Sequence, residues 1–192
     1  MRNYAHLDNY LNVLQSDVYE QPEDSGHSKY AKEVIDRWCS KLVGCQTVLD
    51  LGCGSGFCEP MFARHRIVWK GVTLGPDYLV CEEKGLDVVK EDFNFLSFPD
   101  NSFDLLFARH SFEHTFSPLV SLMEWRRVTK QWVCIIVPNP ANFTVRGKNH
   151  LSVLYSDQLK WLFEVAKLNL IWEDINDFEY RYMLEKVQDD RQ

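Results

Sequence analysis

The 192-residue sequence lacks several features that would assign it to a special class of protein. It has no long apolar stretch, so we expect no segment that crosses a membrane. It has no run of Lys or Arg and a formal net charge of −7, so we do not expect a surface that binds nucleic acid. None of its six cysteines forms a Cys-x-x-Cys pair, which argues against a zinc cluster or a disulfide framework. These absences predict a soluble, cytoplasmic protein with reduced thiols.

The sequence does contain 45% hydrophobic residues, and its length suits one domain with a sizeable core. Short apolar runs alternate with segments of helical spacing. The predicted strands are 47–51, 67–74, 87–90, 103–108, 131–137, 168–172 and 180–184, and the predicted helices between them are 57–64, 77–84, 117–128 and 156–166. This alternation predicts a single doubly wound α/β domain with a mostly parallel, seven-stranded sheet.

The first 45 residues precede this alternation and contain helical patterns at 10–14 and from residue 27 onward. Tyrosines are frequent there, at positions 4, 10, 19 and 30. We expect residues 1–45 to form a helical lid over a site in the domain of residues 46–192. The stretch PNPANFTVRGKNH (138–150) is expected to supply another wall, which predicts a mostly apolar or aromatic pocket.

The most informative stretch is VLDLGCGSG, residues 48–56, in which a buried strand ends in alternating glycines. Glycine permits positive φ and close approach of a ligand, and the helix that follows offers free N–H groups. The dinucleotide fingerprint G-x-G-x-x-G would need a glycine where the sequence has Phe57, and no Gly-Lys-Ser/Thr phosphate loop is present. Taken alone, the turn fits either a ligand site or a tight connection without a ligand.

The pattern Asp-x-Gly-x-Gly-x-Gly after a first strand resembles the first motif of the class I S-adenosylmethionine-dependent methyltransferases. The resemblance continues through KGVTLGPDY (70–78), KEDFNFLSFPDNSFDLLFARHSFEH (90–114) and IIVPNP (135–140), and it covers about residues 30–185. The middle segment is similar to the branch that methylates small molecules. The resemblance implies a Rossmann-like methyltransferase fold, S-adenosylmethionine as cofactor, and a small-molecule or metabolite-linked acceptor.

The resemblance also implies cofactor contacts by position. Asp50 would orient the amino group of the cofactor's methionine part, directly or through water. Asp92, which could instead be a solvated loop acid, would accept a hydrogen bond from the adenine amino group, with Phe93 beside the ring. Arg109 ends a strand that would face the methionine part. The glycines that would pass beneath the methionine part are Gly52, Gly54 and Gly56.

One position departs from the family pattern. Where the family usually has an acid that binds both ribose hydroxyls, this sequence has Thr73. Threonine can bond one hydroxyl but cannot chelate two, and it carries no charge. We therefore expect Thr73 to bind the ribose more weakly or in a different way. Asp77 is the only nearby acid that could take over this role.

Residues 110–114 read HSFEH and match the His-x-x-Glu-His pattern of inverzincin peptidases. The Ser-Pro pair that follows predicts a helix that begins only after the quintet, so His110 and His114 would not share one helical face. Such a peptidase also needs a third ligand, for which Glu185 could be nominated, and a chamber for which this chain is too short. The family resemblance accounts for the quintet without a metal, so we expect no metal site.

Methyl transfer is a displacement at a sulfonium methyl, in which the enzyme mainly aligns and desolvates the reactants. An oxygen acceptor often needs a base as well, and histidine suits this role near neutral pH. The candidate catalytic residues are His110 and His114, while His27 and His150 could act from the lid. Each could instead be a structural histidine bonded to backbone.

Two other functions fit the same pattern. An RNA or protein methyltransferase would share the fold, although the acidity of the chain and the lack of an appended binding domain argue against it. A cofactor-binding partner subunit without catalytic activity would fit Thr73. The sequence leaves the acceptor atom and the oligomeric state open.

Overall fold

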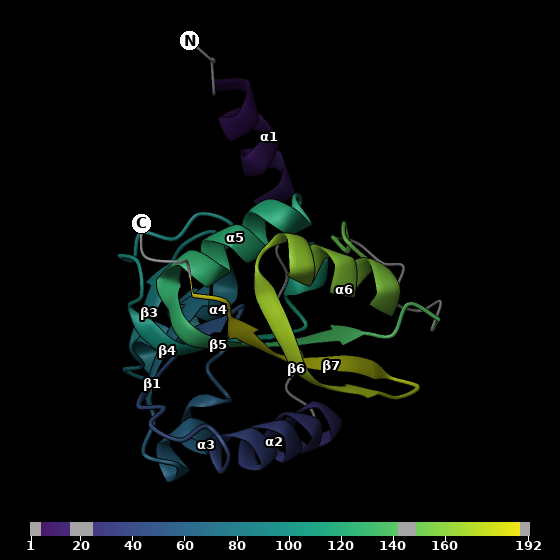
Figure 1. Ribbon diagram of the computed structural model, residues 1–192. Coiled ribbons are helices and arrows are strands. Elements are labelled where there is room, and N and C mark those ends of the chain that lie inside the picture. The colour runs from purple at the N-terminus through teal and green to yellow at the C-terminus, as the bar shows by residue number, and fades with distance from the viewer. Residues whose placement is uncertain (1–4, 16–24, 142–148, 189–192) are drawn as a thin grey trace.

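The protein is an α/β fold in which one sheet lies between two groups of helices, shown in Figure 1. The computed structural model describes residues 5–15, 25–141 and 149–188. The strands are β1 Thr47–Leu51, β2 Val68–Thr73, β3 Val88–Lys90, β4 Phe103–Arg109, β5 Thr129–Pro138, β6 Leu168–Ile175 and β7 Glu179–Lys186. Their order is β3-β2-β1-β4-β5-β7-β6. β1 to β5 pair in parallel, and β7 pairs antiparallel with β5 and β6. The predicted fold class is confirmed.

The helices cover both faces of the sheet. They are α1 Ala5–Gln15, α2 Ser25–Cys39, α3 Glu59–Arg64, α4 Pro76–Glu83, α5 Pro118–Val128 and α6 Ser156–Val165, with a short 3-10 turn η1 at Phe112–His114. In Figure 1, α2 and α3 lie below the sheet, whereas α5 and α6 lie above it. α1 stands out from the body beyond α5. No helix in the described ranges is long and apolar enough to cross a membrane.

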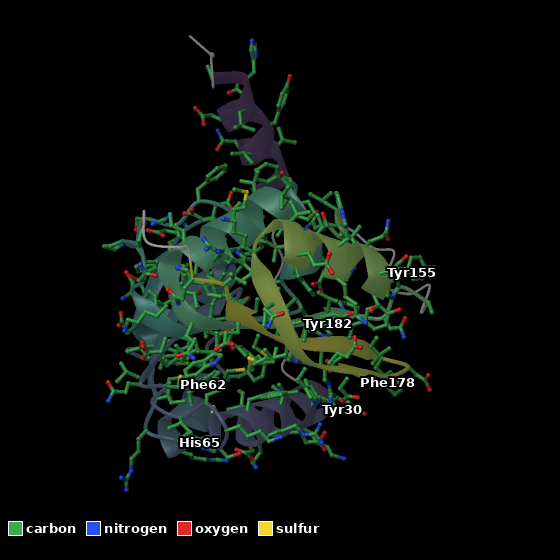
Figure 2. The ribbon with its side chains drawn as sticks, in the orientation of Figure 1. Tyr30, Phe62, His65, Tyr155, Phe178 and Tyr182 are labelled. Carbon is green, nitrogen blue, oxygen red and sulfur yellow. The ribbon has the colours of Figure 1, made fainter. Side chains whose placement is uncertain are left out.

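The central strands are buried on both faces, as expected for parallel strands covered by helices. Successive residues of a strand point to opposite faces, so Leu106 joins the core under α5 and α6 while Phe107 joins the core under α2 and α3. Figure 2 shows Phe62 between α3 and the sheet, and its ring packs edge-on against Phe107 with centroids 5.3 Å apart. At the β6–β7 end, Tyr30 of α2 lies beside Phe178 (Figure 2), with ring centroids 6.3 Å apart.

The β6–β7 hairpin is longer than predicted, and this difference matters for the site. β6 continues to Ile175, past the predicted end at residue 172, and its pairing with β7 has a register shift between Leu170 and Trp172. β7 begins at Glu179, one residue before the predicted start. Glu179 pairs with Pro138 at the C-terminal end of β5. An acidic side chain therefore enters the edge of the sheet where doubly wound folds bind their ligands.

Candidate active site

A cavity of about 870 Å³, its open mouth included, lies at the C-terminal ends of β1, β2 and β4. The glycine turn after β1, the end of β2 and the loop after β3 form one side of it. Segments 110–116 and 149–151 contribute to the other side, and Leu11 of α1 adds to the wall. The strand order reverses between β1 and β4, which is where open α/β sheets bind ligands.

The glycine turn is shaped by backbone conformations that other residues rarely adopt. Gly52, Gly54 and Gly56 have φ values of 68°, 55° and 80°. A Cβ atom at Gly52 would stand 2.7 Å from Cβ of Ser111, and one at Gly56 would stand 2.3 Å from Cδ1 of Leu86. Gly52 and Gly54 line the cavity, whereas Gly56 packs behind it. The turn therefore brings bare backbone to the cavity wall.

Asp50 lies near the end of β1 and is 2% exposed. Its Oδ2 accepts a hydrogen bond of 3.0 Å from Nε1 of Trp69 on the neighbouring strand. Burial raises the pKa of Asp50 to about 7, although the Trp69 hydrogen bond and the charge of Arg109 act in the opposite direction. Asp50 is not among the cavity-lining residues. Its carboxyl group thus sits close to its ionisation point, where a bound cation would shift it toward the carboxylate.

Thr73 and Asp77 line the same part of the cavity, at the end of β2 and the start of α4. Both are buried, with exposures of 6% and 2%. Gly75, with φ of 66°, and Pro76 form the turn between them. The structure therefore brings Asp77 to the neighbourhood of Thr73, as the sequence suggested for an acid replacing the ribose ligand.

Asp92 and Phe93 also line the cavity. Oδ1 of Asp92 accepts hydrogen bonds from the backbone N–H and the side-chain amide of Asn94, at 2.9 and 2.6 Å. These bonds form a local turn that fixes the carboxylate at the cavity wall. The ring of Phe93 packs edge-on against Trp125, with centroids 6.0 Å apart. The loop after β3 therefore presents a fixed acceptor next to an aromatic ring.

His110 follows β4 directly and has a positive φ of 50°, which is uncommon for a residue with a side chain. Its Nε2 lies 2.8 Å from Oε1 of Glu179, and its ring lines the cavity. Arg109 donates to the same oxygen at 3.0 Å, and Arg181 donates to Oε2 at 3.0 Å. Arg109 is not among the cavity-lining residues, because its guanidinium is engaged by Glu179.

The charge of Glu179 determines the tautomer of His110. Burial alone would raise the pKa of Glu179, but the hydrogen bond from His110 and the charges of Arg109, His110 and Arg181 lower it to about 2. Glu179 is therefore a carboxylate near neutral pH, and a carboxylate only accepts hydrogen bonds. Nε2 of His110 must carry the proton, so in the neutral ring the lone pair is on Nδ1. An acid holds a histidine in this way when the histidine serves as a base.

The HSFEH quintet does not form the peptidase arrangement, in which His110 and His114 would share one helical face. Residues Phe112–His114 make a 3-10 turn, and His110 is turned toward Glu179. Glu185 bonds Gln131 and lines a separate cavity with Trp132 and other residues. Instead, Glu113, His114 and His150 each place one possible donor atom within 4.8 Å of the others.

Burial sets the protonation of this second group. It raises the pKa of Glu113 to about 8, with the charges of Arg109 and Glu179 acting in opposite directions. Burial and, to a smaller extent, nearby His150 lower the pKa of His114 to about 4. His114 is therefore neutral near pH 7 and lines the cavity, with Nδ1 bonded to the carbonyl oxygen of Asn149 at 3.0 Å.

The cavity gathers most residues that the sequence proposed. Those that line it are Gly52, Gly54, Thr73, Asp92, Phe93, His110 and His114. Asp50, Gly56 and Arg109 lie behind its wall. The sequence analysis missed Glu179, whose only signal was an acid–arginine pair in an otherwise apolar strand, EYRYML. Tyr4, Tyr19, the side chain of His27 and residues 142–148 of the expected wall lie outside the described residues.

Comparison with known proteins points to the methyltransferases that the sequence motifs resemble. Residues 49–136 match the family model of a methyltransferase domain. A solved S-adenosylmethionine-dependent methyltransferase from Archaeoglobus fulgidus aligns with TM-score 0.66 and 23% identity, over 83% of this chain and 94% of that one. One from Aquifex aeolicus aligns with TM-score 0.63 and 19% identity, over 86% and 100%. The [4+2]-cyclase SpnF aligns with TM-score 0.68 and 18% identity, over 95% and 93%. A search of curated proteins gives no match.

The fold is that of the class I S-adenosylmethionine-dependent methyltransferases, and residues 49–136 match a methyltransferase domain. The sequence motifs predicted this fold and this similarity.

Proposed function

We propose that the enzyme transfers a methyl group from S-adenosylmethionine to a small-molecule or metabolite-linked acceptor bound in the same cavity. The observation that carries the proposal is that one cavity joins the glycine turn and Asp92 on one side to His110 and His114 on the other. Cofactor and acceptor can therefore meet without water between them.

The residues on the glycine side fit the cofactor. S-adenosylmethionine, when bound, supplies an electrophilic sulfonium methyl. The bare backbone at Gly52 and Gly54 would lie against its methionine part, and Asp50 behind the turn would favour its ammonium group. Asp92 would accept from the adenine amino group with Phe93 beside the ring. Arg109 would act through Glu179, to which it donates, because it does not line the cavity.

The ribose subsite combines two residues in this proposal. Thr73 offers one hydroxyl, and Asp77 adds the carboxylate that threonine lacks. Both are buried and line the cavity, which supports a shared role. This arrangement would compensate for the departure of Thr73 from the family pattern.

The acceptor side is apolar with a few polar groups. Leu11, Phe116 and Leu151 line it beside His110 and His114. A pocket of this kind suits a compact, partly aromatic acceptor better than a polymer. Leu11 belongs to α1, so its contact with the cavity supports the α1 part of residues 1–45 as a lid over a catalytic domain of residues 46–192, whereas α2 packs against the sheet.

His110 would act as the general base for a hydroxyl acceptor. Its Nδ1 would take the acceptor proton as the acceptor oxygen bonds to the methyl carbon, while the bond from that carbon to sulfur breaks. Glu179 would hold the ring and stabilise the imidazolium that forms. His114 is the second candidate base. The net charge of −7 counts against an RNA substrate, and the six free thiols suit a cytoplasmic enzyme.

Thermal denaturation tests the proposal. A hundredfold excess of S-adenosylhomocysteine over its Kd should stabilise the protein by about 2.7 kcal/mol, which corresponds to roughly 5–10 °C in Tm. NAD should give no comparable shift, and Gly54→Val should abolish the response. Absence of any shift at millimolar S-adenosylhomocysteine would refute the proposed cofactor site. Turnover with any acceptor would exclude an inactive partner subunit.

A further inference from the structure

Residues 149–152 return to the active site and pack along residues 113–115. The ring Nδ1 of His114 lies 3.0 Å from the carbonyl oxygen of Asn149. The N–H of Ser152 donates to the carbonyl oxygen of Glu113 at 2.9 Å, and its hydroxyl donates to the carbonyl oxygen of Thr115 at 2.6 Å. These three bonds fix His150 beside His114, with ring centroids 4.8 Å apart and ring planes at 74°.

Three donor atoms converge at this point. Glu113, His114 and His150 each contribute one, and these atoms lie within 4.8 Å of one another. Glu113 is 2% exposed, and its Oε2 has no hydrogen-bond partner among the described residues. A buried carboxyl oxygen without a partner costs free energy unless something outside the protein chain satisfies it. A cation between the carboxylate and the two imidazoles would do so.

The hydrogen bond of His114 prepares its ring for such a cation. A carbonyl oxygen only accepts, so Nδ1 of His114 must carry the proton. The lone pair of the neutral ring is then on Nε2. Histidines that bind metals usually donate their other N–H to a carbonyl or carboxylate in this manner, which fixes the tautomer and the ring orientation.

We propose that Glu113, His114 and His150 bind one divalent transition-metal ion, such as zinc, at the wall of the active-site cavity. Two imidazoles and one carboxylate form a donor set typical of catalytic zinc and related ions, with a further position left open. Ligands about 2.0–2.2 Å from a shared ion lie roughly 3.3–3.6 Å apart, so the widest pair must close by about 1 Å. His150 is partly exposed, so we expect its side chain to rotate to make this change.

This site differs from the one that the sequence pattern suggested. In the peptidase pattern His110 would be a ligand, but its Nε2 bonds Glu179 instead. His150, 36 residues after His114, takes its place through the backbone bonds of Ser152 and Asn149. The sequence predicted no metal site, and the proposed site departs from that prediction because His150 completes it in place of His110.

The site adjoins the cavity through His114, which lines it. The open coordination position would bind an acceptor that carries an ionisable oxygen, such as a phenol or an enol, and hold it near His110. This role rests on the proposed methyl transfer, whereas metal binding itself does not.

Metal analysis of the full chain tests the proposal. After treatment with a chelator and gel filtration, the protein should take up one zinc per chain, measured by elemental analysis. Zinc at a hundredfold excess over its Kd should raise Tm by roughly 5–10 °C. Cobalt(II) in its place should give visible d–d bands without a thiolate charge-transfer band, because no cysteine is among the ligands. No stoichiometric uptake of either ion would overturn the proposal.

Matched variants identify the ligands. His150→Ala and Glu113→Gln should each lose the bound zinc and the cobalt bands. The first changes a half-exposed side chain and the second keeps its shape, so both should fold. His110→Ala and His65→Ala should retain one zinc per chain. Uptake that survives in His150→Ala, or that is lost in His110→Ala, would refute the assignment. The S-adenosylhomocysteine shift of each variant, measured on the same samples, separates failure of the metal site from failure of the cofactor site.

Discussion

Nε2 of His110 lies 2.8 Å from Oε1 of Glu179, although the two residues are 69 positions apart in the sequence. His110 directly follows the C-terminal end of β4, and Glu179 begins β7 opposite the end of β5. The pair is thus assembled at the C-terminal edge of the sheet by strand order alone. It leaves Nδ1 of a cavity-lining histidine as the acceptor for a substrate proton.

Replacing His110 with alanine should lower kcat by about 10²–10⁴ if the acceptor is a hydroxyl, the usual range for loss of a general base. Affinity for S-adenosylhomocysteine should hardly change, because the cofactor residues lie on the other side of the cavity. Steady-state kinetics and calorimetric titration measure the two quantities. The same two measurements on His114→Ala serve as the comparison. Nearly full activity in His110→Ala would show that His110 has only a structural role.

Replacing Glu179 with glutamine should change the pH dependence of the rate. The carboxylate favours the protonated imidazole, so the neutral amide should move the rising limb of the pH–rate profile to lower pH. The glutamine oxygen can still accept from Nε2, which keeps the ring in place. A fall in kcat with an unchanged profile would show that Glu179 acts only on stability.

Replacing Asp77 with asparagine should weaken binding of S-adenosylhomocysteine by about tenfold to a hundredfold. The variant removes the only carboxylate proposed for the ribose, and hydrogen bonds to charged groups contribute about 1.5–3 kcal/mol. Thr73→Val should have a smaller effect, since it removes one neutral hydroxyl. If Asp77→Asn binds as tightly as the wild type in calorimetric titration, the ribose contact lies elsewhere.

Replacing Asp92 with alanine should reduce cofactor affinity by a similar factor through loss of the adenine acceptor. Asp92 also anchors the turn to Asn94, so the loss could arise from a distorted loop. Asn94→Ala disturbs the same turn while keeping the carboxylate, and it should bind better than Asp92→Ala. Equal losses in both variants would assign Asp92 to loop structure.

Replacing Asp50 with asparagine should stabilise the cofactor-free protein above pH 7. The folded state holds a proton at Asp50 up to about pH 7, whereas the ordinary pKa is 3.8, so stability falls as pH rises between these values. Asparagine cannot ionise, and its oxygen can still accept from Trp69. Urea unfolding should show an advantage on the order of 4 kcal/mol at pH 8 that vanishes near pH 4. A difference independent of pH would contradict this account.

The sequence determined the fold class, the glycine turn after β1 and the acid–aromatic pair at 92–93, because each depends on residues that are close in the chain. Alternating patterns specify strands and helices locally, and glycines at 52, 54 and 56 specify one backbone turn. The tertiary structure alone decided that His110 pairs with Glu179 and that His114 meets His150. The first contact depends on strand order and the second on backbone bonds from a returning segment, and no local pattern of side chains encodes the distances that these features set.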